Sequence, residues 1–268
     1  MSLDKRTKRL LKQYRVSPRK HLGQSFMVEE GYLYDMVSYA SLSKGDVVLE
    51  IGAGFGALTK VLSPLCKRVV AVEIDYRLAE VLGVEVAGLD NVLLVEGDVL
   101  EVTIPPFNKV VSNPPFSISS PILFWLLEKG FDLAVLTFQR EFAERLAASV
   151  GSKGYSRLTV ETYYRAEVEL METVPREAFI PPPDVDACIV RLKPRKIAPF
   201  RLNNEGMFHE LVRALFTQRN KKMRNAVAGF LRKLGKEKVE ADSLLFHDKR
   251  VRELAPEDFG AIANELAG

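Results

Sequence analysis

The sequence predicts an α/β protein with a sheet of about seven strands, helices on both faces of that sheet, and a small all-helical C-terminal domain. Three observations lead to this prediction. Short apolar runs alternate with amphipathic stretches from about residue 44 to residue 193, as in repeated βα units. The runs are apolar throughout, which is typical of strands covered on both faces. Beyond the linker Lys193–Pro199 almost no strand pattern remains.

The predicted elements follow one another in a regular order. Five apolar runs come first, at Asp46–Ile51, Arg68–Glu73, Asn91–Val95, Lys109–Ser112 and Leu133–Thr137. Two further β-rich stretches, Arg157–Tyr163 and Ala187–Leu192, would complete the sheet. Helical spacing occurs at Tyr76–Ala87 and Glu141–Ser149, and after the linker at Met207–Thr217, Met223–Leu234 and Pro256–Leu266.

The composition narrows the class of protein. The 268 residues are 47% hydrophobic and 27% charged, as in an ordinary soluble globular protein. No apolar run approaches the roughly 18–20 residues of a membrane span, and the N-terminus lacks a secretory signal, so we expect a cytoplasmic protein without membrane contact. Cys66 and Cys188 lie far apart and the histidines are scattered. We therefore expect reduced thiols and no metal site.

Positive charge is concentrated in two blocks, although the net charge is only +3. The first block lies within residues 1–20, where Asp4 is the single acid. The second contains Arg213, Arg219, Lys221, Lys222, Arg224, Arg232, Lys233 and Lys236. Either block alone could be a solvated helix surface. Together they predict a polyanion-binding surface.

Four motifs stand at the ends of successive predicted strands. Gly52, Gly54 and Gly56 follow the first strand and suit a tight turn that approaches a ligand closely. Alone they also fit the dinucleotide fingerprint of a dehydrogenase. Glu73 ends the second strand, where a carboxylate can accept hydrogen bonds from ribose hydroxyls, and Asp98 follows the third, where it could read an adenine amine.

The fourth motif, Asn113-Pro114-Pro115-Phe116, predicts the reaction. The amide oxygen of Asn113 and the carbonyl of Pro114 can accept both N–H bonds of an adenine amine, which localises its lone pair for attack. The prolines hold these oxygens in place before the reaction, and Phe116 offers a face on which an extruded base can stack. The four motifs together predict an S-adenosylmethionine-dependent methyltransferase that acts on an amine.

With these motifs, the chain resembles the ribosomal RNA adenine dimethyltransferases, which dimethylate two adjacent adenosines near the 3′ end of small-subunit rRNA. The resemblance covers nearly the whole chain. It extends to Lys20–Met27, Lys153–Thr159, Phe179–Val185 and Arg213–Arg224. The basic N-terminus, the moderate length and the loop variant resemble archaeal more than bacterial members.

The resemblance implies roles for individual residues and regions. Besides Gly54 of the turn, cofactor contacts are expected from Gln24, Ser25, Met27, Gly52, Glu73, Asp98 and Asn113. Phe179 would face Phe116 beside the target base, with a packed core aromatic as the alternative. The implied regions are a basic arm with a cofactor-closing motif at 1–27, a Rossmann-like methyltransferase domain at 28–196 and a helical RNA-binding domain at 197–268. RNA contacts are expected from Arg213, Arg219, Lys221, Lys222 and Arg224.

The chain departs from the family pattern at two places. The family commonly has Asn-Leu-Pro-Tyr where this chain has Asn-Pro-Pro-Phe, and Asn where this chain has Ser25. Asn-Pro-Pro-aromatic loops also occur in DNA adenine and protein glutamine methyltransferases. Two alternatives to a small-subunit dimethyltransferase are stronger than the DNA and protein methyltransferases. They are an adenine methyltransferase for large-subunit rRNA and an inactive RNA-binding assembly factor. The expected partner is small-subunit rRNA in a pre-ribosomal particle, bound by a monomer.

Overall fold

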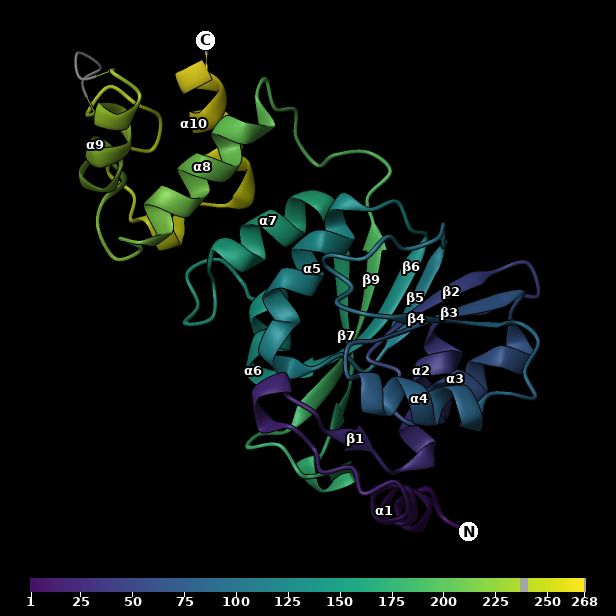
Figure 1. Ribbon diagram of the computed structural model, residues 1–268. Coiled ribbons are helices and arrows are strands. Elements are labelled where there is room, and N and C mark those ends of the chain that lie inside the picture. The colour runs from purple at the N-terminus through teal and green to yellow at the C-terminus, as the bar shows by residue number, and fades with distance from the viewer. Residues whose placement is uncertain (237–240, 268) are drawn as a thin grey trace. The chain divides into compact units, whose positions relative to one another are not determined.

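The computed structural model describes residues 1–236 and 241–267, and its main sheet is mixed (Figure 1). The strand order is β4-β3-β2-β5-β6-β9-β7. The first five are parallel, and β9 runs antiparallel to β6. The bounds are β2 (Val47–Ile51), β3 (Arg68–Glu73), β4 (Val92–Glu96), β5 (Lys109–Ser112), β6 (Leu133–Gln139), β7 (Ala166–Val174) and β9 (Ala187–Pro194). The predicted sheet of about seven strands is confirmed.

Helices cover both faces of this sheet. Figure 1 shows α2, α3 and α4 on one side and α5 on the other. The helices of the described residues are α1 (Leu3–Gln13), α2 (Glu30–Tyr39), α3 (Ala57–Leu62), α4 (Tyr76–Glu85), α5 (Ser119–Glu128), α6 (Arg140–Leu146), α7 (Arg157–Arg165), α8 (Glu205–Phe216), α9 (Met223–Lys233) and α10 (Pro256–Ala267). The predicted helices at Tyr76, Glu141, Met207, Met223 and Pro256 are confirmed to within a few residues.

One predicted strand is wrong, because Arg157–Tyr163 forms helix α7. Ser156 stands at the N-cap, and its N–H donates to the hydroxyl of Thr159 (3.1 Å), which fixes the start of the helix. Val160 and Tyr164, four residues apart, then pack into the same apolar cluster. This packing overrides the β preference of the threonines and valine. The seventh strand is instead β7, in which glutamates alternate with apolar residues.

The chain divides into two compact units. One contains residues 1–143 and 169–194, and the other contains residues 144–168 and 195–268. In the second unit, α7, α8, α9 and α10 surround a core that includes Phe208, Val227 and Phe259. The C-terminal part is helical, as predicted, while the domain boundaries at residues 27/28 and 196/197 stay predictions. No helix of the described residues is long and apolar enough to cross a membrane.

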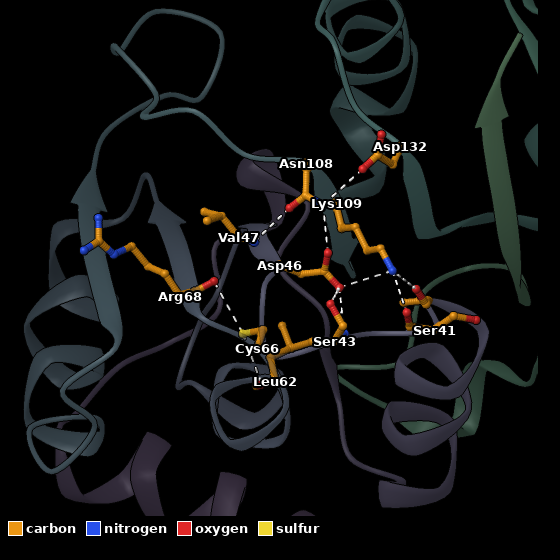
Figure 2. Close-up of polar contacts among 11 residues, drawn as sticks. Ser41, Ser43, Asp46, Val47, Leu62, Cys66, Arg68, Asn108, Lys109 and Asp132 are labelled. Atoms are coloured by element: carbon orange, nitrogen blue, oxygen red, sulfur yellow. Dashed lines mark hydrogen bonds and ion pairs between the residues drawn. The ribbon is translucent and has the colours of Figure 1, made fainter. Parts of the chain in front are cut away.

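Polar side chains at the amino ends of β2 and β5 form a closed network (Figure 2). Asn108 donates one amide hydrogen bond to Asp46 (2.8 Å) and accepts another from the backbone N–H of Val47 (2.8 Å). Lys109 forms an ion pair with Asp46 (3.3 Å) and donates to the carbonyl of Ala40 (3.0 Å). Burial alone would raise the pKa of Asp46, but hydrogen bonds from Asn108, Ser43 and Lys109 lower it below its ordinary value.

Both cysteines are buried thiols that form no disulfide in the described structure. Figure 2 shows the Cys66 thiol between the backbone carbonyls of Leu62 and Arg68, at 3.3 and 3.4 Å. Burial raises the pKa of Cys66 to about 11. A thiol with such a pKa stays protonated at neutral pH and is a poor nucleophile. Cys66 is therefore a packing residue.

Candidate active site

The strand order reverses between β2 and β5, and this point fixes the position of the site. Ligands of open α/β sheets bind at the carboxyl ends of the strands where such a reversal occurs. The glycine turn follows β2 and the Asn113 loop follows β5. A cavity that is partly open to solvent lies there and is lined by both segments and by Glu73.

The glycine turn lines this cavity with backbone atoms that no side chain covers. Gly52 has φ +75°, and a Cβ at this position would lie 3.1 Å from the ring of Pro115. Gly54 has φ +57°, and its N–H donates to the carboxylate of Glu73 (2.8 Å). A side chain would therefore strain both residues; at Gly52 it would press on the loop after β5, and at Gly54 on the ring of Phe26. Only glycine allows the backbone of the turn to lie this close to its neighbours.

Glu73, at the end of β3, is 4% exposed and lines the cavity. Its two oxygens accept from the N–H groups of Gly54 (2.8 Å) and Asp75 (2.9 Å). Burial raises its pKa, and these hydrogen bonds oppose the rise. Each oxygen retains a lone pair, so the fixed carboxylate can still accept from the hydroxyls of a ribose.

A second, smaller cavity contains Asp98, two residues beyond β4. One carboxylate oxygen of Asp98 accepts from the N–H of Leu100 (2.9 Å). The other walls are apolar and include Ile74, Val99 and Ile118. An apolar pocket with one carboxylate acceptor in its lining suits an adenine ring. Ile74 and Val99 were not predicted as site residues, although each directly follows a predicted site acid, Glu73 or Asp98.

Asn113 carries an unpaired acceptor beside the main cavity. Its amide nitrogen donates to the backbone carbonyl of Ser25 (3.3 Å), which orients the side chain. Its amide oxygen is buried, and no described residue donates to it. A buried acceptor without a partner costs about 1–3 kcal/mol, so such groups are uncommon in folded proteins. Pro114, whose carbonyl is the second expected acceptor, is buried next to it.

The N-terminal motif Lys20–Met27 lies at the same site, because its last two residues pair with a segment far along the chain. Phe26 and Met27 form strand β1, which pairs antiparallel with β8 (Phe179–Ile180). The hydroxyl of Ser25 donates to the carbonyl of Pro181 (2.6 Å). Ser25 and Met27 both line the cavity. The serine that replaces the family asparagine therefore contacts the cavity while its hydroxyl is directed to another chain segment.

Gln24 also lines the cavity, but its amide is used within the protein. It donates to Asp75 (2.9 Å) and accepts from the N–H of Arg19 (2.7 Å). Asp75 caps the N-terminus of α4 and bonds Arg77, which with Gln24 lowers the pKa of Asp75 to about 2. Asp75 was missed in the sequence. Its place directly before a predicted helix was the available signal.

Phe116 and Phe179 meet, but not as parallel plates. Their ring centroids are 6.0 Å apart and the planes cross at 72°. Phe179 is 2% exposed within the core of the first unit, and Phe116 packs against it half-buried. In this geometry Phe179 supports Phe116, which presents the more accessible face. A direct contact between Phe179 and a base stays a prediction.

The family model described as ribosomal RNA adenine dimethylase matches residues 15–268. This chain belongs to that family. A probable ribosomal RNA small subunit methyltransferase A of Methanosarcina acetivorans is 44% identical over 91% of each chain. The protein of the same description from Methanopyrus kandleri is 48% identical over 81% of this chain and 79% of its own. Both relatives are archaeal.

Two solved structures share the fold of this dimethylase family member. A dimethyladenosine transferase from Plasmodium falciparum has a TM-score of 0.79 and 32% identity, covering 88% of this chain and 95% of its own. The 23S rRNA methyltransferase ErmE has a TM-score of 0.69 and 30% identity, covering 91% of this chain and 100% of its own. The Rossmann-like methyltransferase fold is confirmed.

The predicted RNA contacts of this family member fall into two groups. Arg213 and Lys221 are exposed, and Arg213 borders a groove between α8 and α9. Arg219 instead donates to the carbonyls of Ser152 and Lys153 (2.9 Å each) and so holds that loop. The remaining two basic residues, Lys222 and Arg224, form ion pairs with acidic side chains. The described residues contain no group of side chains that could hold a metal ion.

Proposed function

We propose that this protein transfers methyl groups from S-adenosylmethionine to the exocyclic amines of two adjacent adenosines near the 3′ end of small-subunit rRNA. One observation carries the chemistry. The buried, unpaired amide oxygen of Asn113 lies beside the cavity at the sheet reversal, where an amine N–H would satisfy it. The family and the names of the relatives support ribosomal RNA as the substrate.

The residues of the site fit the cofactor. Glu73 would accept from the ribose hydroxyls, Asp98 would read the adenine amine, and the glycine turn would let the backbone lie against the ligand. Ser25 and Met27 would close the amino-acid side. When bound, S-adenosylmethionine supplies an electrophilic methyl group on a sulfonium.

The protein would activate the amine mainly by holding it. The amide oxygen of Asn113 and the carbonyl of Pro114 accept its two N–H bonds, so the nitrogen becomes more tetrahedral and its lone pair points at the methyl group. Acceptors that are fixed before the reaction stabilise the transition state without reorganising. Phe116, braced by Phe179, would stack on the extruded base. No side-chain base is required, because the amine becomes acidic once it is methylated.

RNA binding would draw on the exposed basic side chains. Arg213 and Lys221 in the helical unit, and Lys5 and Arg9 in α1, are exposed and can meet phosphates. We further propose that the protein reads the shape of a pre-ribosomal particle and works as a monomer in the cytoplasm. Naked rRNA that is methylated as well as the particle would argue against shape recognition.

Methyl transfer to small ribosomal subunits that lack the modification tests the proposal. Nucleoside mass analysis should find dimethyladenosine, located at two neighbouring positions near the 3′ end. Activity on large subunits only would favour the function that the ErmE relationship suggests. Binding of S-adenosylmethionine with no transfer to either subunit would identify an inactive assembly factor.

A further inference from the structure

Helix α1 has an apolar face that packs on the first unit. Leu3, Thr7 and Leu10 are buried, at a spacing that places them on one side of a helix. Leu10 joins Phe55, beside the glycine turn, and Leu78 of α4 in one apolar cluster. The basic residues Lys5, Lys8, Arg9 and Lys12 are exposed. The segment predicted as a basic arm therefore contains a docked helix.

An ion triad fixes α1 to the helices around the cofactor site. Arg6 of α1 and Lys60 of α3 both bond the same carboxylate oxygen of Glu85 in α4, at 2.5 and 2.6 Å. The pKa of Glu85 lies below its ordinary value, because the hydrogen bonds from Lys60 and Arg6 outweigh the effect of burial, which would raise it. The triad holds α1 beside the helix that begins at the glycine turn.

Thr7 lies at the point where α1 reaches the main cavity. It lines that cavity together with Gln24, Ser25 and Glu73, and it does not line the smaller cavity at Asp98. Thr7, Leu33, Phe55 and Ala57 also line a second hollow along α1. These side chains therefore form the partition between the cofactor cavity and the hollow behind it.

The side chain of Thr7 borders both spaces. The residue is only 4% exposed, yet it lines the cofactor cavity as well as the hollow behind it. A threonine hydroxyl has one donor and two acceptor sites, so at the wall of a cavity it can exchange a hydrogen bond with a bound ligand. The family model matches from residue 15 onward, so Thr7 precedes the matched residues.

We propose that Thr7 is a cofactor-binding residue and that α1 is a wall of the cofactor site. Its hydroxyl would hydrogen-bond the ribose or amino-acid part of the cofactor, on the side opposite to Asp98. This inference rests on the proposed function, since it assumes that the cavity takes S-adenosylmethionine. It adds a residue that precedes all of the family's motifs.

Calorimetric binding of S-adenosylhomocysteine to the full chain tests this proposal. Thr7→Val keeps the shape and removes the hydroxyl, so the dissociation constant should rise by about 2- to 10-fold, the value of one neutral hydrogen bond. The melting temperature of the same variant without ligand shows whether the fold is kept, and a loss of affinity at an unchanged melting temperature supports the role of the hydroxyl. Thr7→Ser should bind as the wild type does.

Thr162→Val provides a matched control. Thr162 is a buried threonine whose hydroxyl has no partner, and it lies in α7 and lines neither cofactor cavity. This variant should gain thermal stability and keep the wild-type dissociation constant. Unchanged affinity in Thr7→Val, with binding by the wild type, would overturn the role of Thr7 alone. If the wild-type chain does not bind S-adenosylhomocysteine, the proposed function and this inference both fall.

Discussion

The two edges of the central sheet use the same kinds of polar residue in opposite ways. At the amino edge, Asn108 and Lys109 satisfy Asp46, and Asn108 uses both ends of its amide. At the carboxyl edge of the same strand β5, the amide of Asn113 is paired on one side only. The two asparagines are separated by the four residues of one strand.

This difference separates stability from function within one sheet. Paired groups at the amino edge hold β2 and β5 in register and leave nothing for a ligand. At the carboxyl edge the protein keeps an unpaired acceptor, left-handed glycines and the buried carboxyl of Glu50. Such features reduce stability, and a bound ligand can compensate for them. Substitutions at the two edges should therefore have opposite consequences.

Asn113→Ala should have the largest effect on activity. Loss of the oriented acceptor should lower kcat by about 10²–10³-fold, as for other preorganised transition-state groups. The free energy of unfolding should change by less than about 1 kcal/mol, because the oxygen has no partner to lose. Methyl transfer to unmodified small subunits and urea unfolding measure the two quantities. A variant that retains near-normal methyl transfer would exclude the proposed role.

Asn108→Ala is the matched change at the other edge. It removes hydrogen bonds to Asp46, Asp132 and the N–H of Val47, and it leaves a buried carboxylate and a strand N–H with fewer partners. The free energy of unfolding should fall by about 2–3 kcal/mol, while kcat stays within about twofold of the wild type. An equal loss of activity in both asparagine variants would refute the separation of the edges.

Asp75 should make part of the stability dependent on acid pH. Its pKa, about 2 in the folded protein against 3.8 ordinarily, is lowered chiefly by Arg77. A lowered pKa stabilises the folded state above the unfolded pKa, so about 2 kcal/mol should be lost as the pH falls from about 5 to 2. Asp75→Asn should lack this part of the dependence. Unfolding curves at several pH values would detect it.

Two glycine variants should distinguish rigid from adaptable neighbours. Gly52→Ala places a methyl group against the Pro115 ring of the loop after β5, whereas Gly54→Ala meets the ring of Phe26. Both incur left-handed strain of about 1–2 kcal/mol. Only the first should also lower kcat strongly, because a proline ring cannot swing away and a phenylalanine can. Similar kcat values for the two variants would contradict this account.

Glu50→Gln should have the smallest effect near pH 5. Burial raises the pKa of Glu50 to about 8, so it is protonated in the folded protein and resembles glutamine. A raised pKa contributes stability below the unfolded pKa that is lost as pH rises. The variant should therefore gain on the wild type by up to about 1.4 kcal/mol per pH unit between pH 5 and 8. A constant difference in unfolding free energy across this range would show that Glu50 does not titrate there.

The sequence alone predicted the parts of the fold that depend on local pattern. Val47–Ile51 and Arg68–Glu73 are covered on both faces, so their apolar runs are unmistakable. Strand-end positions of Glu73, Asp98 and Asn113 followed directly from those strands, because parallel strands bring their carboxyl ends to one edge.

The remaining features depend on contacts between distant segments. Strands β1 and β8 have two residues each, and no local pattern reveals a pair that short. The bracing position of Phe179 and the loop-holding role of Arg219 also follow from tertiary packing. For α7, the hydrogen bond from the N-cap Ser156 to Thr159 and a buried helical face outweighed residues with β preference. Helix α1 was not predicted, because its sequence is rich in charged residues and only three of its positions are buried.

The contacts of Ser25 have a consequence for the order of events during synthesis. Its carbonyl holds Asn113, 88 residues away, and its hydroxyl reaches Pro181, 156 residues away. Closing loops of that length is entropically unfavourable until the surrounding sheet has formed. The side chain of Asn113 can therefore take its observed orientation only after Pro181, about two thirds of the way along the chain, has been added. A chain that stops short of Pro181 should not transfer methyl groups.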